Sequence, residues 1–441
     1  VLLSVAIPAF RRVWVFHLLV SKYLLLALGD VLRIRPILVA MAGRSYVRLT
    51  GPIALRLFCE DMGVTFVKFG QMVASSTGIF PGAYVDEFQK VLDEVRPFPY
   101  EDVQRIIDEE LGETAARLKN VSVKPLASAS VAQVHTAELA DGTKVVIKVQ
   151  RPDLKRIINA DMAIMRFFAG VAQRFSSDAR IVNPVGIFED LAETLAEETD
   201  FRKEANNLEQ FNDIMVKHGH TRVHAPVPQW EFVTERLLVM ERFYGTRVDN
   251  VEGINARGVD AEASLVEAMQ AWFQSLVFHG FFHGDMHAGN LMLLDNEDIG
   301  FLDFGIVGRF ADRERYLVTD YVVAFATADF KKVAEVIGEM GGVATGVDMD
   351  ALGADLKEVY EPLLSKSFSD VNYADIIPRI NQVARKHKMT MPKEFVLITK
   401  QLLYFDRYAK LLAPSLNVFT DPRLIMSMMN DIMKVRQEEQ T

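Results

Sequence analysis

The sequence of 441 residues contains a single cysteine, Cys59. One thiol excludes a disulfide framework and a thiolate zinc cluster, and it fits a reducing, cytoplasmic compartment. Basic residues are also scarce, because 49 Lys and Arg stand against 59 Asp and Glu, for a formal net charge of −10. A nucleic-acid binder needs basic residues to neutralise phosphates, so no nucleic-acid partner is expected. The length predicts roughly two or three globular units.

Long uninterrupted apolar runs are also absent, although the first 58 residues are strongly apolar. Charges at Arg11, Arg12 and Lys22 keep every run below the ~18 residues that a spanning helix needs. Residues 1–58 hold eight basic residues and one acid, a net of +7, which leaves −17 on residues 59–441. This pattern favours helices that lie on an anionic membrane surface. The alternative is a basic helical pair packed on the acidic body, and the sequence leaves both open.

The secondary-structure signals after residue 50 change from helical to strand-rich. Apolar residues at helical spacing predict helices within 51–119. A hairpin turn is predicted at Asp141-Gly142. Short β-branched runs predict three strands around it: 121–126, 131–139 and 143–150.

The signals beyond residue 150 become mostly helical again. Two long helices and four short strands are predicted: helices at 152–175 and 183–211, and strands near Val227 and at 237–240, 291–294 and 299–302. The remainder beyond Glu241 is predicted to be helical. We therefore expect an α+β chain of two lobes, divided into four segments: 1–58, 59–120, 121–241 and 242–441.

The strongest pattern of polar residues lies in the C-terminal half. His-Gly-Asp-Met-His-Ala-Gly-Asn spans 283–290, and Asp-Phe-Gly spans 303–305. An Asp, an Asn five positions later, a strand pair and then Asp-Phe-Gly is the order used for phosphoryl transfer in protein kinases. Mg²⁺ prefers oxygen ligands, so Asp303 and Asn290 are predicted to bind it. Asp285 is predicted to orient or deprotonate an attacking hydroxyl or water.

A phosphate site also needs a cation and a backbone that approaches closely. Lys148 ends a predicted strand and resembles the strand lysine that contacts nucleotide phosphates in kinases. Small residues upstream occupy the place of the kinase glycine-rich loop, and alanine makes such a turn stiffer than glycine does. We expect six of them to contact the nucleotide: Ala127, Ser128, Ala129, Ser130, Val131 and Ala132.

With three further features, these residues resemble the UbiB family of atypical, protein-kinase-like kinases and ATPases associated with ubiquinone biosynthesis. The further features are Lys-Phe-Gly-Gln at 68–71, Glu-Thr-Asp at 198–200, and Glu204. The similarity extends from about residue 56 to about residue 410. The resemblance implies a bilobal protein-kinase-like fold, with an N-terminal helical extension bearing Lys68 folded across the active site.

The resemblance also implies roles in nucleotide binding. Lys148 would pair with Glu204 and hold the phosphates, and Glu241 would begin the hinge whose backbone meets adenine. ATP and Mg²⁺ are the implied cofactors. Lys148 and Lys68 join Asp285 in the implied catalytic set.

A second group of residues is implied to restrict access to the site. Lys68 and Gln71 would face Glu198 and Asp200, where a protein kinase binds its peptide. Without the resemblance, the acidic residues Glu198, Asp200 and Glu204 would be interpreted as a solvated helix face.

The implied function is an atypical kinase-like ATPase that supports isoprenoid quinone biosynthesis. The implied partners are ATP, an isoprenoid lipid or quinone precursor, quinone-biosynthesis proteins and an anionic membrane surface. The implied location is cytoplasmic, at the inner face of a membrane. Peptide phosphorylation is disfavoured because a helical pattern resumes at Asp312, no Ala-Pro-Glu follows, and Gly284 stands where a kinase has arginine before the catalytic Asp285.

Three alternatives remain at this stage. One is a nucleotide-binding pseudoenzyme that serves as a scaffold in a biosynthetic complex, and another is a true protein or small-molecule kinase. The third is a zinc site, because His283 and His287 are four residues apart. Gly284 and Gly289 argue against the regular helix that such a zinc site needs.

Overall fold

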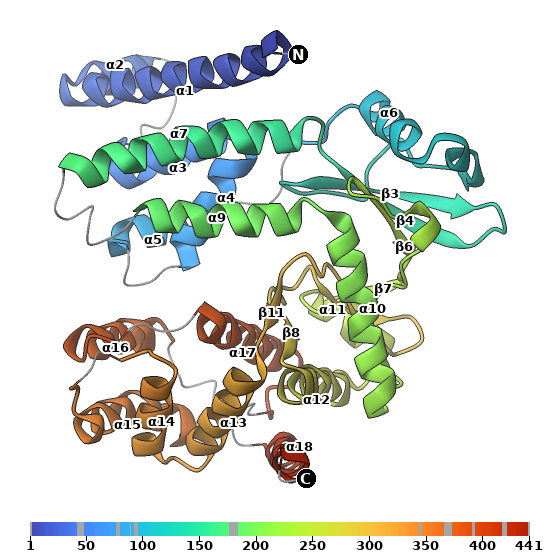
Figure 1. The fold of residues 1–441 in the computed structure, drawn as a ribbon, viewed down its shortest axis with the longest axis vertical. Helices are drawn as coiled ribbons and strands as arrows, with labels where there is room; N and C mark the ends of the chain where they lie inside the picture. The colour runs from blue at the N-terminus through green and yellow to red at the C-terminus, as the bar shows by residue number, and fades with distance from the viewer. Residues whose placement is uncertain are drawn as a thin grey trace. The chain divides into compact units, whose positions relative to one another are not determined.

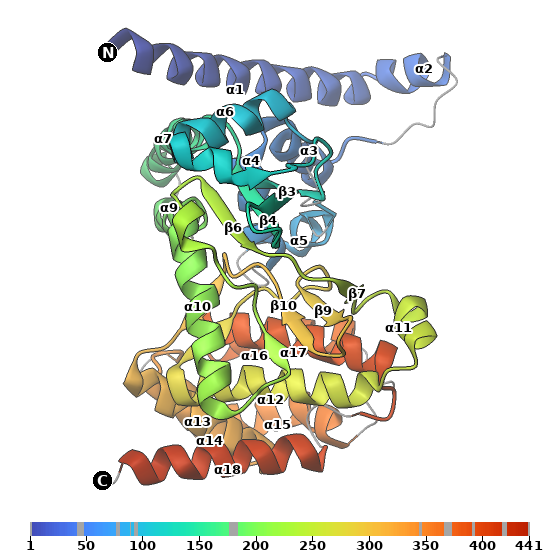
Figure 2. The ribbon, with the colours of Figure 1, turned by 90° about the vertical axis from the view of Figure 1, so that its right-hand side faces the viewer.

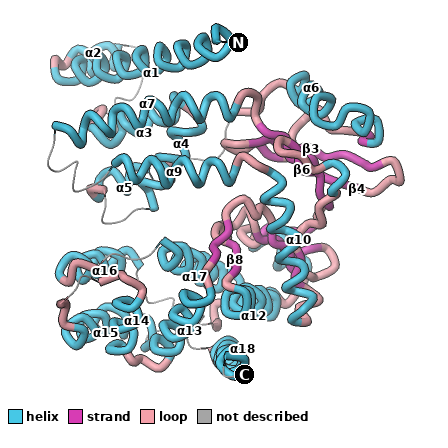
Figure 3. The backbone as a smooth tube through the Cα atoms, in the orientation of Figure 1, coloured by secondary structure: helices cyan, strands magenta, loops and turns pink. Residues whose placement is uncertain are grey.

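A computed structural model describes residues 2–41, 48–75, 80–88, 90–91, 96–175, 184–343, 346–365, 373–389, 393–416 and 421–439. The chain forms two compact units. The first comprises Val1–Arg202 with Gln229–Val239, and the second comprises Lys203–Pro228 with Met240–Thr441. Helices predominate in both units, and each also contains strands (Figure 3). The chain is therefore of the predicted α+β class.

The first unit begins with helices, as the apolar spacing predicts. They are α1 (Leu2–Val31), α2 (Ile34–Met41), α3 (Gly51–Met62), α4 (Val64–Ser75), α5 (Gly82–Phe88) and α6 (Tyr100–Leu111). The long helix α7 (Leu154–Phe175) follows later in the sequence, and α1 packs against both α3 and α7 (Figure 1 and Figure 2). The prediction of helices within 51–119 is confirmed.

By length and composition, α1 has a segment that could cross a membrane. This segment is Arg11–Val31, within one continuous helix. The sequence prediction required an uninterrupted apolar run, and that criterion was too strict because a long helix can include two charges and remain apolar on average.

The sheet of the first unit contains the predicted hairpin. Its strands are β1 (Leu118–Lys119), β2 (Ala127–Ser128), β3 (Ala132–Leu139), β4 (Lys144–Gln150) and β6 (Leu237–Glu241), whose last two residues belong to the second unit. The strand order is β1-β3-β4-β6, and β2 pairs with β3. Apolar residues of α6 at helical spacing, such as Val103 and Ile107, pack against Val145 and Ile147 of β4. This core fixes β4 in place.

The predicted strand at 121–126 is wrong. Ser122 and Leu126 each make one backbone hydrogen bond to β3, but the segment between them forms no strand. Val123 and Leu126 are exposed, and Pro125 has no N–H to donate. A run that buries neither face gains too little to form a strand.

The predicted helix at 183–211 is two helices, α9 (Pro184–Glu198) and α10 (Phe201–His218). The break falls at Thr199 and Asp200. The Thr199 carbonyl accepts a hydrogen bond from Gln150 Nε2 at 2.8 Å, and the Phe201 N–H donates to the Glu235 carbonyl at 3.1 Å. These tertiary hydrogen bonds take the place of hydrogen bonds within a helix. No local feature of the sequence indicates the break.

The second unit combines short strands with many helices. The strands are β5 (Val223–His224), β7 (Gly245–Arg247), β8 (Phe281–His283), β9 (Leu291–Leu294), β10 (Ile299–Phe301) and β11 (Val307–Arg309). One sheet has the order β5-β10-β9-β7, and β11 pairs with β8. The predicted strands at 291–294 and 299–302 are confirmed, whereas β7, β8 and β11 are too short to show a period.

The helices of the second unit follow the predicted pattern beyond Glu241. They are α11 (Val251–Arg257), α12 (Ala261–His279), α13 (Asp312–Ala326), α14 (Phe330–Glu339), α15 (Met349–Ser365), α16 (Tyr373–Lys386), α17 (Lys393–Leu412) and α18 (Pro422–Glu439). A buried cluster from α13 to α16, including Val333 and Leu356, forms one core of this unit.

Candidate functional site

The loop that carries Asp285 is held by a buried histidine. His283 ends β8, and its Nδ1 accepts a hydrogen bond from the Asp285 N–H at 3.1 Å. Its Nε2 donates to the Leu302 carbonyl at 2.8 Å. Burial lowers the pKa of His283, which fits a neutral ring with one donor and one acceptor nitrogen. Because both nitrogens are engaged, His283 is a structural link between two loops, and the zinc alternative lacks a ligand.

Two side chains of helix α17 hydrogen-bond to the backbone of the same loop. Gln401 accepts a hydrogen bond from the Met286 N–H at 2.7 Å and donates to the Gly284 carbonyl at 2.6 Å. Tyr408 donates to the Met286 carbonyl at 2.7 Å. Gln401 and Tyr408 are buried. The sequence reasoning missed both, because nothing in the spacing connects residues more than a hundred positions apart.

Asn290 precedes β9 and Asp303 follows β10, so both lie at the open end of the β9–β10 hairpin. Asn290 Nδ2 donates to the Asp285 carbonyl at 2.9 Å, which leaves the amide Oδ1 as the atom able to bind a cation. The backbone of Asp303 is left-handed, with φ of +56°, and its Oδ1 accepts from the Gly305 N–H at 3.4 Å. A non-glycine residue rarely adopts this conformation, and such strain is concentrated at functional sites.

Helix α10 is attached to the Asp-Phe-Gly segment. Asn207 Nδ2 donates to the Phe304 carbonyl at 2.9 Å, and Arg309 donates to Asn207 Oδ1 at 2.7 Å. The rings of Phe211 and Phe304 have centroids 4.9 Å apart. The predicted residue Glu204 is buried on the same helix, and its Oε2 is 4.0 Å from where a Cβ on Gly305 would lie. The structure thus brings Glu204 close to the Asp-Phe-Gly segment within the second unit.

Lys148 lies in β4 of the first unit, directly opposite Val134 of β3. Its Nζ is 5.4 Å from the centroid of the Phe201 ring, a cation–π contact. The implied pairing of Lys148 with Glu204 joins the two units and stays a prediction.

The alanine-rich loop needs no glycine for its backbone. None of residues 127–132, all of which the structure describes, has a positive φ. The Ala129 N–H donates to the Ala132 carbonyl at 2.8 Å, which closes a tight turn. Alanine is therefore sterically acceptable throughout this loop.

Arg151 holds this loop in place. Its guanidinium donates to the Ala129 carbonyl at 2.8 and 3.0 Å, to Ser128 Oγ at 3.0 Å, and to the Arg96 carbonyl at 3.2 Å. Burial lowers the pKa of Arg151. The sequence reasoning missed this residue, although its position just after the Lys148 strand is a weak signal.

The Lys-Phe-Gly-Gln motif lies on α4 and contacts the Glu-Thr-Asp motif. Lys68 Nζ is 3.0 Å from Glu198 Oε2, whereas Gln71 lies one turn further along α4. Asp200 instead accepts hydrogen bonds from Arg202 at 2.8 and 2.9 Å, which lower the pKa of its carboxyl group. Lys68 therefore pairs with Glu198 and Asp200 with Arg202, and the expectation that these motifs restrict access to the site stays a prediction.

Glu241 is the exposed last residue of β6. Its backbone N–H donates to the Val227 carbonyl at 2.9 Å. Any backbone contact of Glu241 with an adenine ring would therefore use its carbonyl oxygen.

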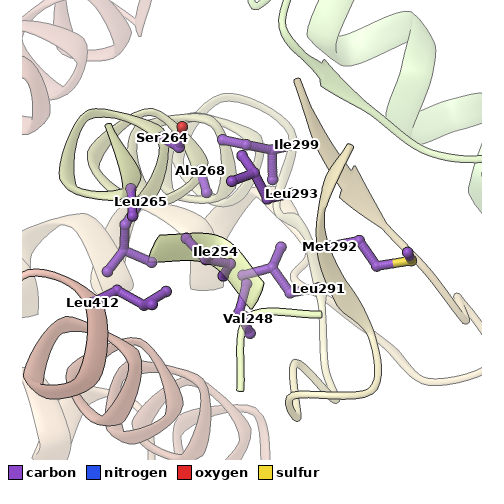
Figure 4. A pocket seen from close by; sticks show the side chains of 11 residues that line it. Val248, Ile254, Ser264, Leu265, Ala268, Leu291, Met292, Leu293, Ile299 and Leu412 are labelled. Carbon is purple, nitrogen blue, oxygen red and sulfur yellow. The ribbon is translucent and has the colours of Figure 1, made fainter. Parts of the chain in front are cut away.

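An apolar pocket lies in the second unit, beside β9. Its lining includes Val248, Leu265, Leu291 and Leu412, and the labelled side chains in Figure 4 surround it. None of the predicted site residues lines it. It contains almost no polar surface, so it has nothing to bind a phosphate, and we interpret it as a gap in the core.

The fold and these motifs define a protein-kinase-like protein. The model of the ABC1 atypical kinase-like domain matches residues 90–337, and that of the UbiB helical domain matches residues 356–417. The first match alone covers more than half of the chain. The chain belongs to the ABC1 atypical kinase-like family, with the helical domain of UbiB, and the predicted resemblance is confirmed. Gln401 and Tyr408 lie within the matched helical domain.

Relatives cover most of the chain. Uncharacterized protein Rv0647c of Mycobacterium tuberculosis is 38% identical over 388 residues, which are 86% of this chain and 78% of that protein. An uncharacterized aarF domain-containing protein kinase of Arabidopsis thaliana chloroplasts is 35% identical over 402 residues (85% and 74%). The probable protein kinase UbiB of Cellvibrio japonicus is 33% identical over 377 residues (84% and 68%).

One solved structure supports the fold. The complex of Rv3197 with erythromycin from Mycobacterium tuberculosis aligns with a TM-score of 0.55 at 21% identity, over 83% of this chain and 96% of that one. At this identity the likeness concerns the fold alone.

Proposed function

We propose that this chain binds Mg²⁺-ATP and acts as an atypical kinase or ATPase that supports isoprenoid quinone biosynthesis of the ubiquinone type. Membership of the ABC1 family supports the class of enzyme. The observation that carries the proposal is the open end of the β9–β10 hairpin, where an oriented Asn290 amide precedes β9 and a left-handed Asp303 follows β10.

The donor atoms at this hairpin suit Mg²⁺. Asp303 offers a carboxylate and Asn290 an amide oxygen, and Mg²⁺ typically takes one or two such protein ligands and completes its shell with water and substrate phosphates. The described residues contain no cluster of three or more His, Cys, Asp or Glu able to hold a metal ion alone. A site completed by ATP phosphates needs no such cluster. When bound, the ion would neutralise charge on the transferring phosphate.

The remaining roles follow from the residues of each unit. Lys148, supported by the Arg151-braced loop, would contact phosphates, and the Glu241 carbonyl would accept from adenine. Asp285 would accept the proton of the attacking hydroxyl or water as a new bond forms to the γ-phosphorus and the bond to the ADP oxygen breaks. With water as acceptor the result is ATP hydrolysis.

The segment after Asp303 favours slow hydrolysis over peptide phosphorylation. Strand β11 begins at Val307 and helix α13 at Asp312, so the described residues leave no room for an extended activation segment between them. A protein kinase uses such a segment to position its peptide. We propose an isoprenoid lipid or quinone precursor and quinone-biosynthesis proteins as partners. The proposed location is the cytoplasmic face of a membrane, with an anionic surface as a further partner.

Phosphate release by the purified chain tests the catalytic proposal. Wild type should bind ATP with Mg²⁺ and release phosphate. The rate of phosphate release by Asp303→Asn should be lower by a factor of about ten or more. Asp295→Asn is a matched control, because Asp295 is exposed in the turn of the same hairpin. Nucleotide binding without release above the Asp303→Asn level would favour the scaffold alternative, and no binding under any condition would refute both.

Quinone profiling tests the pathway. A strain that lacks the protein should contain less of its isoprenoid quinone, with recovery by wild type but not by Asp303→Asn. An unchanged quinone content would refute the pathway assignment while leaving the catalytic one intact.

A further inference from the structure

We infer that α1 lies in the plane of an anionic lipid surface, with its outward face inserted and with exposed residues of α7 extending the lipid-facing area. The inference rests on the membrane contact included in the proposed function. It adds which residues meet the lipid and how the helix is oriented.

The polarity of α1 is inverted relative to a helix on a water-soluble protein. Ten large apolar side chains in or just after α1 are at least half exposed: Val13, Trp14, Leu18, Leu24, Leu25, Leu28, Val31, Leu32, Ile34 and Ile37. Monomeric soluble proteins seldom expose so large a contiguous apolar area. A helix in contact with lipid has this pattern, because its apolar side chains face away from the protein.

Three polar residues of α1 contact the protein, whereas Arg11 and His17 are exposed. Arg12 makes a two-pronged ion pair with Asp161 of α7, at 2.5 and 2.8 Å. Tyr23 donates to Asp61 of α3 at 2.7 Å, and Lys22 pairs with the same carboxylate at 2.6 Å.

The charged residues within the apolar stretch are all paired inside the chain. Between Val13 and Val31 these are Lys22, with Asp61, and Asp30, which pairs with Arg35 at 2.6 Å. The exposed side of this stretch therefore carries the polar side chain of His17, and both of its charged residues have partners in the chain.

Helix α7 adds to the same surface. The rings of Phe16 in α1 and Phe168 in α7 stack, with centroids 5.2 Å apart, so the two helices touch at this point. Phe167, Val171 and Phe175 of α7 are exposed beyond this contact, and Figure 2 shows α1 running over α7 and α3. Exposed aromatic side chains are typical of the membrane interface.

The neighbours of α1 favour an in-plane helix over a spanning one. Although Arg11–Val31 is long enough to cross a bilayer, it packs along α3, which carries Arg56, Glu60 and Asp61. A spanning α1 would carry these charges into the hydrocarbon, which is costly. An in-plane α1 keeps them on the protein side of the interface.

Charge favours a lipid over a second copy of this chain. Arg11 and Arg33 are exposed at the two ends of the apolar stretch, so two such faces would repel each other in a symmetric pair. The same charge attracts anionic headgroups.

Vesicle binding tests the surface. The full chain should float with vesicles of phosphatidylcholine and phosphatidylglycerol, and less with phosphatidylcholine alone. Leu18→Ser with Leu25→Ser should weaken this binding about tenfold or more. Val216→Ser is the matched control, because Val216 is an exposed apolar residue of α10 in the other unit and its loss should change nothing.

Trp14 reports insertion without altering the apolar face. In a Trp230→Phe background, Trp14 fluorescence should be quenched more by lipids brominated near the headgroup than by lipids brominated at the chain ends. The only other tryptophan, Trp272, is buried. This measurement stands even if the serine variants fold poorly.

Cysteine labelling separates the in-plane from the spanning orientation. With Cys59 replaced by Ser, Arg11→Cys and Arg33→Cys, at the two ends of the stretch, should both react with an impermeant maleimide added outside the vesicles. Protection of one of them would overturn the in-plane orientation.

The vesicle and fluorescence results distinguish the remaining possibilities. Flotation with vesicles but without Trp14 quenching, or flotation that the serine changes do not affect, would overturn the assigned surface but not membrane contact. No floating at all would refute the membrane contact itself, and a stable dimer dissociated by the serine changes would replace lipid with a second copy.

Discussion

Lys68 Nζ lies 3.0 Å from Glu198 Oε2, an ion pair that joins α4 to the last residue of α9 across 130 positions of sequence. The exposed fractions of the two side chains are only 15% and 8%. The pair thus brings two sequence motifs together within one unit. Because both side chains are largely buried, removal of one partner should lower the free energy of unfolding.

Removal of the lysine alone should destabilise the first unit. In Lys68→Met the largely buried Glu198 carboxylate loses its ion pair with Lys68, and we expect a loss of about 3 kcal/mol in the free energy of unfolding. Adding Glu198→Gln should recover much of that loss, because the uncompensated charge is gone. Urea denaturation of the four members of this double-mutant cycle measures the coupling.

Lys144→Met is the control for this cycle. Lys144 pairs with Glu138 on the exposed β3–β4 hairpin, and such a surface pair contributes less than about 1 kcal/mol. Equal losses in Lys68→Met and Lys144→Met would show that the Lys68 pair behaves as a surface pair.

Arg151 should act as a positioning residue for the alanine-rich loop. In Arg151→Gln the loop loses its bonds to the Ala129 carbonyl and Ser128 Oγ, and we expect the KM for ATP to rise about tenfold with a smaller change in kcat. Arg151→Lys should recover little, because an ammonium group cannot span several acceptors as the guanidinium fork does. Steady-state kinetics and thermal unfolding check this together.

The control for Arg151 is Arg156→Gln, because Arg156 is an exposed residue of α7. A fall in melting temperature with an unchanged KM would show that Arg151 stabilises the fold without positioning the loop.

The elements that depend on local chemistry could be predicted from the sequence. The hairpin at Asp141-Gly142 follows from turn residues between β-branched runs and the strand 291–294 from a short apolar run, and both are present. The proposed metal ligands Asn290 and Asp303 could be identified because the spacing of the motif alone indicates them. These features need no knowledge of distant contacts.

The features that sequence reasoning missed depend on tertiary contacts. The helix break at Thr199 depends on a hydrogen bond from Gln150, and the loop that carries Asp285 is held by Gln401 and Tyr408 of a distant helix. The pairing of Asp200 with Arg202 is local but competes with the motif-based expectation. A single sequence does not show which of two available partners an acidic side chain takes.

Gly70 of the Lys-Phe-Gly-Gln motif should not tolerate a methyl group. A Cβ at this position would lie 2.7 Å from Cδ1 and 2.8 Å from Cε1 of the buried Phe88, so α4 and α5 would have to separate. We expect Gly70→Ala to cost about 1–3 kcal/mol of unfolding free energy. Adding Phe88→Leu should restore part of it by making room.

Gly170 provides the opposite expectation. Gly170 lies inside α7, and apart from the helix's own backbone nothing lies within 4 Å of where a Cβ would be. Gly170→Ala should therefore raise the free energy of unfolding by about 0.5–1 kcal/mol, because alanine favours a helix more than glycine does. Calorimetry of both variants checks the pair. Stabilisation by Gly70→Ala as well would show that the packing of α4 against α5 is looser than described.

The ion pair of Arg12 with Asp161 should make the docking of α1 depend on pH. Asp161 is fully buried, and burial raises the pKa of its carboxyl group while Arg12 lowers it. In Arg12→Met the pKa should rise further, and we expect a loss of about 3 kcal/mol near neutral pH. A carboxyl group whose folded pKa is raised binds its proton more tightly in the folded state, so the loss should shrink as the pH falls.

Denaturation of Arg12→Met across the pH range measures this dependence. Arg12→Met with Asp161→Asn is the control, because it leaves no buried carboxyl group and should be insensitive to pH at this site. A deficit in Arg12→Met that is the same at every pH would show that lost packing, and not the unpaired carboxylate, is responsible.

The histidine pair at the ends of α10 and α12 should weaken the second unit in acid. His218 Nε2 and His279 Nε2 are 2.9 Å apart, so one ring donates a hydrogen bond to the other. Burial, and then repulsion by His218, lowers the pKa of His279 to about 4, and burial also lowers that of His218. With an unfolded pKa of about 6.5, the stabilisation is present above pH 6.5 and is lost as the pH falls toward 4.

The size of this loss should be about 1 kcal/mol, because both rings are partly exposed and solvent screens them. The nearby carboxyl group of Asp431 has a raised pKa, also from burial, and so opposes the trend by favouring the folded state in acid. Comparison of wild type with His279→Gln isolates the histidine contribution, because Asp431 is common to both. The urea midpoint of wild type should fall more steeply below pH 6.5 than that of His279→Gln. Parallel curves would mean that the His218–His279 bond contributes nothing to the pH dependence.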